Sequence, residues 1–184
     1  MKTHIELSLK TSEVYQLFER KINRDRLFIQ AILHKFNIVI NRCNQQEPQA
    51  LLTYKQLEQK LHRLTKQFGN EIIKFRLLLA QKKNFDNNKI SYAVQFKPII
   101  TLTNPLAMQL VELIETYDEL IAVHKLLRFA GCFESDGIYF ENVKRIQKLV
   151  NQQLSGFILK SKQCSRILNK KNNILCLIDS FFAI

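Results

Sequence analysis

Three acidic side chains stand close together in one predicted helix, at Glu115, Asp118 and Glu119. Paired carboxylates can perform general acid–base catalysis when other polar groups hold a substrate against them. No second cluster in the sequence is placed to face this one, so a set of salt bridges on the helix surface is the favoured interpretation. The alternative is that Asp118 orients Arg128.

Other residues that could act as nucleophiles or metal ligands are scattered. The histidines are His4, His34, His62 and His124. Their dispersal predicts no metal site. Cys132 follows Gly131 near a predicted helix end, but no partner histidine accompanies it as a base. The sequence also lacks the P-loop, GxGxxG and GxSxG motifs. We therefore expect a protein that is not an enzyme and carries no cofactor.

Cysteine usage and the chain ends bear on the compartment. The four cysteines, Cys43, Cys132, Cys164 and Cys176, show no CxxC spacing. This favours reduced thiols in a cytoplasmic protein. The first residues, MKTHIELSLK, are charged and alternating, unlike a signal peptide. The last eleven, ILCLIDSFFAI, are too short to span a bilayer. They are expected to dock on the core or on another subunit.

Polar side chains alternate with apolar ones in two short stretches, IELSLKT at 5–11 and IITLTNP at 99–105. Period-two alternation is typical of a strand buried on one face. Ile5, Leu7 and Leu9 form the apolar face of the first strand. Its other face carries His4, Glu6, Ser8 and Lys10. The corresponding face of the second strand carries Ile99, Thr101 and Thr103.

Helical periodicity accounts for most of the remaining chain. The predicted helices span about 12–42, 49–82, 105–130 and 138–154, followed by a basic segment at 160–171. The polar cluster NRDR at 23–26 is expected to break or bend the first helix, and Gly69-Asn70 to kink or interrupt the second. Loops are predicted at 44–50 and 82–89. In the strand region 90–103, Pro98 removes one ladder donor.

The helix ends carry recognisable signals. Thr11 or Ser12 offers a hydroxyl N-cap for the first helix. Asn104 followed by Pro105 is a strong start for the third, and Gly131 is its natural terminator. The third helix is apolar on most sides, which predicts that it is the central buried helix.

The two strand–helix stretches resemble each other. With a shift of 93 residues, LKTSEVYQLFE at 9–19 lies over LTNPLAMQLVE at 102–112, and the cap position, the apolar phase and the strand phase agree. Such a repeat suggests two strand–helix units related by a pseudo-twofold axis. Paired antiparallel, the two strands would satisfy each other's backbone groups.

The charge predicts a polyanionic partner. The chain has 28 Lys and Arg against 16 Asp and Glu, a net charge of +12. The two ends are basic, and the middle, at 91–140, is slightly acidic. Nucleic acid is the favoured partner, an anionic membrane is disfavoured, and a basic protein with no such partner is the alternative.

A two-stranded ribbon backed by helices fits the major groove of DNA. Its exposed face would read base edges through His4, Glu6, Ser8, Lys10, Ile99, Thr101 and Thr103. The helix starts at Thr11, Ser12 and Asn104 would face flanking phosphates. The cations assigned to phosphate contacts are Lys2, Lys10, Arg20, Lys21, Arg24 and Lys97. The alternative is an amphipathic hairpin whose polar face meets only water.

Two stretches carry a resemblance to known proteins. IELSLKTSEVYQLFE at 5–19 resembles the strand and first helix of ribbon-helix-helix DNA-binding proteins. TNPLAMQLVELIETYDELIAVHKLLRFAG at 103–131 resembles AcaB-like regulators encoded on integrating conjugative elements and plasmids. The resemblance implies a bacterial mobile-element protein acting on transcription. The chain departs from the pattern, because NRDR has no Gly for the inter-helix turn and helix 49–82 has no counterpart in minimal members.

The fold class expected is mainly α with a two-stranded antiparallel ribbon: a single-chain pseudo-dimeric ribbon-helix-helix core plus extra helices. The core domain is 1–155, with units at 3–43 and 90–153 flanking helix 49–82; a basic segment and apolar tail occupy 156–184.

The function expected is sequence-specific binding of double-stranded promoter or operator DNA by a regulator of a conjugative element, in the bacterial nucleoid. We also expect a homodimer and no small-molecule substrate. The alternative function is a helical interaction protein of the conjugative transfer machinery.

Overall fold

The computed structural model describes the backbone of residues 3–24, 26–82 and 95–181, and side chains as far as Leu159 except that of Asn23. The element order is β1 (Thr3–Glu6), α1 (Ser12–Glu19), β2 (Lys21–Asn23), β3 (Arg26–Leu27), α2 (Phe28–Asn44), α3 (Pro48–Ala80), β4 (Ile99–Leu102), α4 (Pro105–Phe129) and α5 (Asp136–Phe181). The fold is mainly helical with a two-stranded antiparallel sheet of β1 and β4, as predicted.

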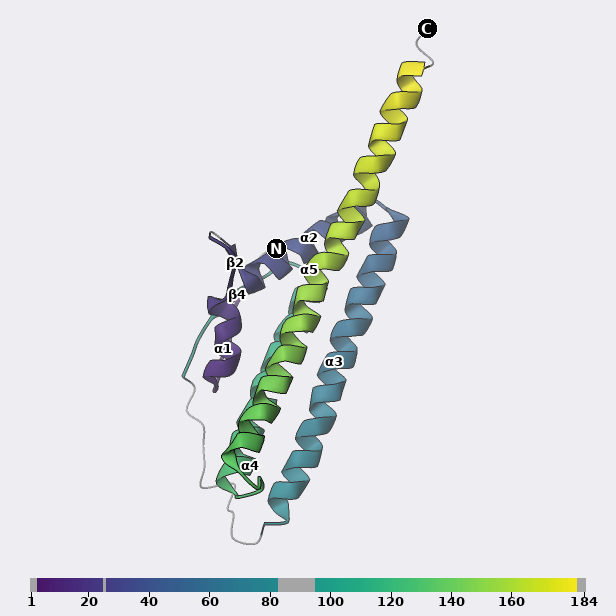
Figure 1. The fold of residues 1–184 in the computed structure, drawn as a ribbon. Helices are drawn as coiled ribbons and strands as arrows, with labels where there is room; N and C mark the ends of the chain where they lie inside the picture. Colours follow the sequence, from purple (N-terminus) through teal and green to yellow (C-terminus); the bar gives the residue numbers. More distant parts are fainter. Residues whose placement is uncertain (1–2, 25, 83–94, 182–184) are drawn as a thin grey trace.

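Three long helices, α3, α4 and α5, lie side by side and form the body of the molecule (Figure 1). α4 is buried along nearly its whole length, including Leu110, Ile114, Ile121 and Leu127. Apolar residues on most sides leave such a helix no face to turn to water, so it lies in the centre. The prediction of a central buried helix is confirmed.

The ends of α4 follow local chemistry. The Asn104 side chain accepts a hydrogen bond from the Ala107 N–H at 2.9 Å. Pro105 occupies the first turn, where its missing N–H costs nothing. Gly131, just beyond the helix, has a φ of +65°, a conformation that only glycine adopts without strain. Both predicted end signals are confirmed.

α3 starts at Pro48, close to the predicted position, and is one continuous helix through Gly69 and Asn70. The predicted interruption there is wrong. Buried residues at spacings of three and four, such as Leu57, Leu61 and Leu64, dock α3 on α4 and α2. This packing outweighs the small helix penalty of one glycine.

The first predicted helix is divided in two. α1 ends at Glu19, and the short hairpin of β2 and β3 intervenes before α2 begins at Phe28. The break falls at the NRDR cluster, as expected. The hairpin is closed by the Phe28 N–H, which donates to the Arg20 carbonyl at 2.7 Å.

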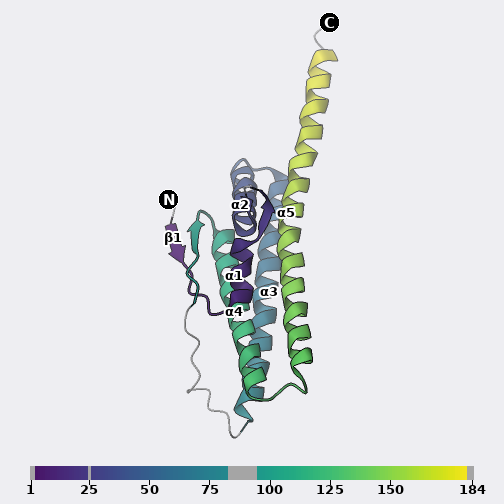
Figure 2. The same cartoon turned by 60° about the vertical axis from the view of Figure 1, so that its left-hand side comes forward.

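α5 continues without a break from Asp136 to Phe181 and projects beyond the other helices (Figures 1 and 2). The predicted helix at 138–154 and the basic segment at 160–171 are therefore parts of one helix. The helix also passes through the predicted domain boundary after residue 155, and the domain division itself stays a prediction. Most of the predicted loop at 82–89, and residues 90–94, lie outside the described residues.

Candidate nucleic-acid interface

β1 and β4 form an antiparallel ribbon at one edge of the molecule (Figure 2). Thr3 pairs with Leu102, His4 with Thr101, Ile5 with Ile100, and Glu6 with Ile99. The pairing continues beyond the strands, because the Leu7 N–H donates to the Pro98 carbonyl at 2.9 Å and the Leu9 N–H to the Phe96 carbonyl at 3.0 Å. The two predicted strand regions, about 90 residues apart in the chain, are confirmed as neighbours.

The inner face of the ribbon packs on the helices. Leu7 and Leu9 are fully buried and Ile100 is 2 % exposed. They join a core that includes Val14 of α1 and Leu106 of α4. Burial of these side chains holds the ribbon against the bundle at roughly 1.5–3 kcal/mol for each large aliphatic residue.

The outer face of the ribbon is open to solvent. His4, Glu6 and Ser8 are exposed, Thr101 is half-buried, and Ile99 is 66 % exposed. The predicted division between an apolar inner face and a polar outer face is confirmed. Two cross-strand contacts order this surface. Thr101 Oγ1 lies 3.1 Å from His4 Nδ1, and Lys97 Nζ lies 3.4 Å from a Glu6 carboxylate oxygen.

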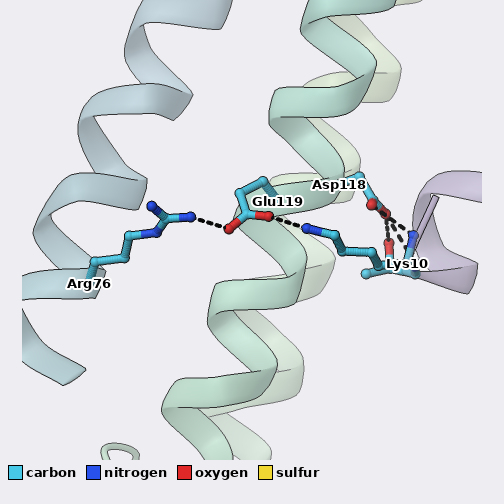
Figure 3. A network of polar contacts seen from close by, with 5 residues as sticks. Lys10, Arg76, Asp118 and Glu119 are labelled. Carbon is cyan, nitrogen blue, oxygen red and sulfur yellow. Dashed lines mark hydrogen bonds and ion pairs between the residues drawn. The ribbon is translucent and has the colours of Figure 1, made fainter. Parts of the chain in front are cut away.

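Asp118 of α4 anchors the segment that joins β1 to α1. Its carboxylate accepts hydrogen bonds from the Lys10 N–H at 2.8 Å, the Thr11 N–H at 3.0 Å and the Thr11 hydroxyl at 2.6 Å. Asp118 is 3 % exposed and Thr11 is fully buried. A buried carboxylate with three donors is satisfied, and it fixes the position at which the ribbon leaves the helices (Figure 3).

Glu119 forms a bridge beside this anchor. One carboxylate oxygen lies 2.7 Å from Lys10 Nζ and the other 2.6 Å from Arg76 Nη2, so that α3, α4 and the end of the ribbon are linked (Figure 3). Burial acts to raise the pKa of Glu119. The hydrogen bonds and charges of Lys10 and Arg76 outweigh burial and hold the pKa below its ordinary value.

The sequence interpretation of the acidic cluster was therefore incomplete. Asp118 is buried and does not contact Arg128, which instead pairs with Asp136 at 2.7 Å. Glu119 does form ion pairs, but they join separate segments of the chain. The signal that could have identified Asp118 is its place on the most apolar helix, where a charge requires donors.

Several predicted site residues are engaged inside the protein. Thr11 is buried and its hydroxyl donates to Asp118. The Thr11 side chain therefore forms no cap hydrogen bond with α1 and does not reach a phosphate. The Ser12 hydroxyl contacts Glu13 at 3.3 Å and forms no cap hydrogen bond. Lys10 is held by Glu119. Asn104 caps α4 and also donates to Asn37 at 2.6 Å, and the Thr103 hydroxyl donates to the same Asn37 oxygen at 2.6 Å.

The predicted phosphate-binding cations fall into separate places. Lys97 is exposed on the ribbon. Arg20, Lys21 and Arg24 belong instead to the β2–β3 hairpin and its approach. The Arg20 guanidinium lies over the Phe28 ring, and Nη1 donates to Asn151 of α5 at 2.6 Å. Lys2 lies outside the described residues.

A groove of about 730 Å³ runs between β4 and the helices α1 and α2. β4 residues from both faces of the ribbon line it, and none of the described β1 residues does, so it follows the edge of β4. Its opposite wall includes Phe18 of α1 and Leu33 of α2. No pattern in the sequence predicts this groove, because it forms between elements that are distant in the chain.

Comparison with known proteins adds one finding. No family model matches the sequence, and no curated protein matches it. The crystal structure of selenomethionine-containing AcaB from uropathogenic E. coli superposes on the chain with a TM-score of 0.74. The superposition covers 94 % of this chain and 84 % of AcaB. The chain has the AcaB fold.

This agreement supports an AcaB-like fold, and the ribbon-helix-helix core stays a prediction. The two chains are 12 % identical, so the AcaB fold is shared without close sequence similarity. In the part of the chain that the structure describes, no helix is long and apolar enough to cross a bilayer. The described residues also contain no group of three His, Cys, Asp or Glu side chains arranged to hold a metal ion.

Proposed function

We propose that the chain is a sequence-specific DNA-binding transcriptional regulator of a conjugative or other mobile element, and that the β1–β4 ribbon enters the major groove. The observation that carries this proposal is the antiparallel ribbon itself. The side chains of its inner face, Leu7, Leu9 and Ile100, are buried, while its outer face carries exposed hydrogen-bonding groups. The net charge of +12 and the AcaB fold support it.

The outer face offers chemistry that can distinguish base pairs. A two-stranded ribbon fits the major groove, about 12 Å wide. There the Ser8 and Thr101 hydroxyls can donate or accept, Lys97 can donate to guanine, and Glu6 can accept from cytosine. The contacts of His4 with Thr101 and of Glu6 with Lys97 hold these side chains in place before DNA binds.

The hairpin cations suit a different task. Arg20, Lys21 and Arg24 carry positive charge in and beside the β2–β3 hairpin, just before the start of α2. Contacts from these residues to phosphates would raise affinity for every sequence and would carry no sequence information. We therefore expect substitutions on the ribbon face to change the preferred DNA sequence, and substitutions of the hairpin cations to weaken binding to every sequence.

We also propose a single-chain ribbon-helix-helix core, with β1–α1–α2 and β4–α4–α5 as its two strand–helix–helix units. The antiparallel register of β1 and β4 supports a pseudo-twofold relation between the strands. The relation does not extend along the first helices, because α1 has 8 residues and α4 has 25.

Binding to fluorescently labelled promoter fragments of the element, compared with random DNA of equal length, tests the function. We expect nanomolar affinity for a preferred site. Ser8→Ala and Thr101→Ala should change the preferred sequence, at about 1–3 kcal/mol for each lost base contact. Lys21→Ala should weaken binding to specific and random DNA alike. Thr116→Val is the control, because the Thr116 hydroxyl donates to a carbonyl of its own helix.

Equal affinity for the element's promoters and for random DNA would contradict a sequence-specific regulator. A Ser8→Ala or Thr101→Ala variant that binds with unchanged preference would exclude the ribbon as the reading surface, even if the protein binds DNA.

A protein–protein interaction module is the second candidate. The groove beside β4 favours it, because Phe18, Leu33 and the exposed Ile99 give it an apolar lining. On the ribbon face, the ion pair of Glu6 with Lys97 contributes no net charge. A pull-down at moderate salt with added nuclease separates the candidates: a transfer-machinery partner retained after nuclease treatment would favour the second.

A further inference from the structure

A second cavity, of about 520 Å³, lies where α3, α4 and α5 meet. Its lining includes Phe68 and Phe75 of α3, His124 of α4, and Arg145 and Lys148 of α5. The volume is within the range of sites that bind small molecules, and clefts between bundle helices are common places for such sites. The proposed DNA-binding surface uses none of these residues.

The buried residues of the lining are largely apolar, and some of them are aromatic. Phe68 and Leu120 are each 2 % exposed. The Phe75 ring meets the His124 ring edge-on, with 4.5 Å between their centroids. Flat aromatic walls favour a flat apolar body, which can stack on them or meet their edges.

His124 adds one polar atom to this lining. The residue is 4 % exposed, and its Nδ1 lies 3.0 Å from the Leu120 carbonyl oxygen. Because a carbonyl oxygen can only accept, Nδ1 carries the proton and Nε2 keeps a lone pair in the neutral ring. Burial lowers the pKa of His124 and so favours the neutral ring. No described residue donates a hydrogen bond to Nε2.

The rim of the cavity is cationic. Arg145 and Lys148 are exposed, and within the described residues neither forms an ion pair. Glu71, the one acidic residue among the described residues of the lining, is paired with Lys74 at 2.8 Å. Two exposed cations in a lining that is otherwise largely apolar favour an anion.

We propose that the cavity between α3, α4 and α5 binds a small aromatic hydroxycarboxylate. The carboxylate pairs with Arg145 and Lys148 at the rim, the ring rests against Phe68 and Phe75, and the hydroxyl donates to His124 Nε2. The compound acts as a bound ligand and is not transformed.

Three related probes separate the contribution of the carboxylate from that of the hydroxyl when each is titrated into the full-length protein by isothermal calorimetry. 4-Hydroxyphenylacetate should bind with a stoichiometry of one. Phenylacetate should bind at least about tenfold more weakly, because it leaves His124 Nε2 without a donor. Tyramine, which keeps the hydroxyl but carries a cation, should show no binding at the same concentrations.

Two matched variants locate the site. Arg145→Gln should weaken binding of 4-hydroxyphenylacetate about tenfold, since it removes a charge-assisted contact. Lys144→Gln removes one neighbouring exposed charge that is not part of the lining, and it should leave the affinity unchanged. His124→Gln tests the hydroxyl contact through a ratio: the preference for 4-hydroxyphenylacetate over phenylacetate should shrink, whatever happens to stability.

The proposal is overturned if 4-hydroxyphenylacetate does not bind, if phenylacetate binds equally well, or if Lys144→Gln and Arg145→Gln weaken binding equally. None of these results bears on the DNA-binding proposal, because the promoter titration uses no ligand and different variants.

Discussion

Asp118 is the residue on which the position of the ribbon most directly depends. Asp118→Ala leaves the Lys10 and Thr11 amides and the Thr11 hydroxyl buried without an acceptor. Unsatisfied buried donors cost about 1–3 kcal/mol each, so we expect the free energy of unfolding to fall by about 3 kcal/mol or more. Thr11→Val removes a single hydroxyl donor and should cost about 1 kcal/mol. Urea denaturation measures both.

Glu112→Gln provides the comparison, because Glu112 is exposed on the same helix. Its free energy of unfolding should change by less than about 0.5 kcal/mol. If Asp118→Ala were no more destabilising than Glu112→Gln, the anchor described here would be wrong.

Glu119 makes the free energy of unfolding depend on pH in the acidic range. Its pKa in the folded protein is held below the ordinary value of 4.5. The stabilisation that ionised Glu119 contributes is therefore fully present above pH 4.5. It is lost as the pH falls through the lower pKa that Glu119 has in the folded protein. We expect the stability difference between wild type and Glu119→Gln to be constant near neutral pH and to shrink below pH 4.5. Denaturation curves between pH 3 and 7 measure it, with Glu115→Gln as the control on the same helix.

At the scale of elements, the register of β1 and β4 can be tested by cross-linking. The Leu7 N–H donates to the Pro98 carbonyl, so the adjacent pair of Glu6 and Ile99 is a non-hydrogen-bonded pair. Cα atoms in such pairs are about 4.5 Å apart, which a disulfide can bridge. The double variant Glu6→Cys/Ile99→Cys should therefore oxidise to an intramolecular disulfide. Mass spectrometry of digested peptides distinguishes this bond from any formed by the native cysteines.

The variant Glu6→Cys/Ile100→Cys is the matched control for the register. Ile100 is one residue further along the strand and faces the core. A one-residue shift moves a side chain to the other face of a sheet, so this pair should not cross-link. Efficient cross-linking of the control, or failure of the first pair, would show that the strands pair differently.

At the scale of the whole molecule, the charge distribution predicts a salt effect. If DNA binding neutralises four phosphates, affinity should fall about 100-fold between 50 and 200 mM salt. Fluorescence anisotropy across this range gives the slope of log affinity against log salt concentration. Arg24→Ala should make that slope shallower by about one if Arg24 contacts a phosphate. A flat salt dependence would argue against DNA and in favour of a protein partner.

The sequence by itself determined the features that arise from neighbours along the chain. Alternation at 5–9 and 99–103 predicted which strand faces are buried, because successive strand residues point to opposite sides. Asn104 and Pro105 predicted the start of α4, and its apolar composition predicted a central position. The division of the first helix at NRDR followed from local polarity.

Only the tertiary structure decided the features that depend on residues far apart in sequence. Thr11 is a residue type that commonly caps helices, yet its hydroxyl donates a hydrogen bond to Asp118, which is 107 residues away in the chain. Gly69 and Asn70 suggest an interruption, yet packing against α2 and α4 keeps α3 continuous. The cavity around His124 exists only where three helices meet. Local propensity contributes about 1 kcal/mol or less per residue, and a buried hydrogen bond or packed side chain can exceed it.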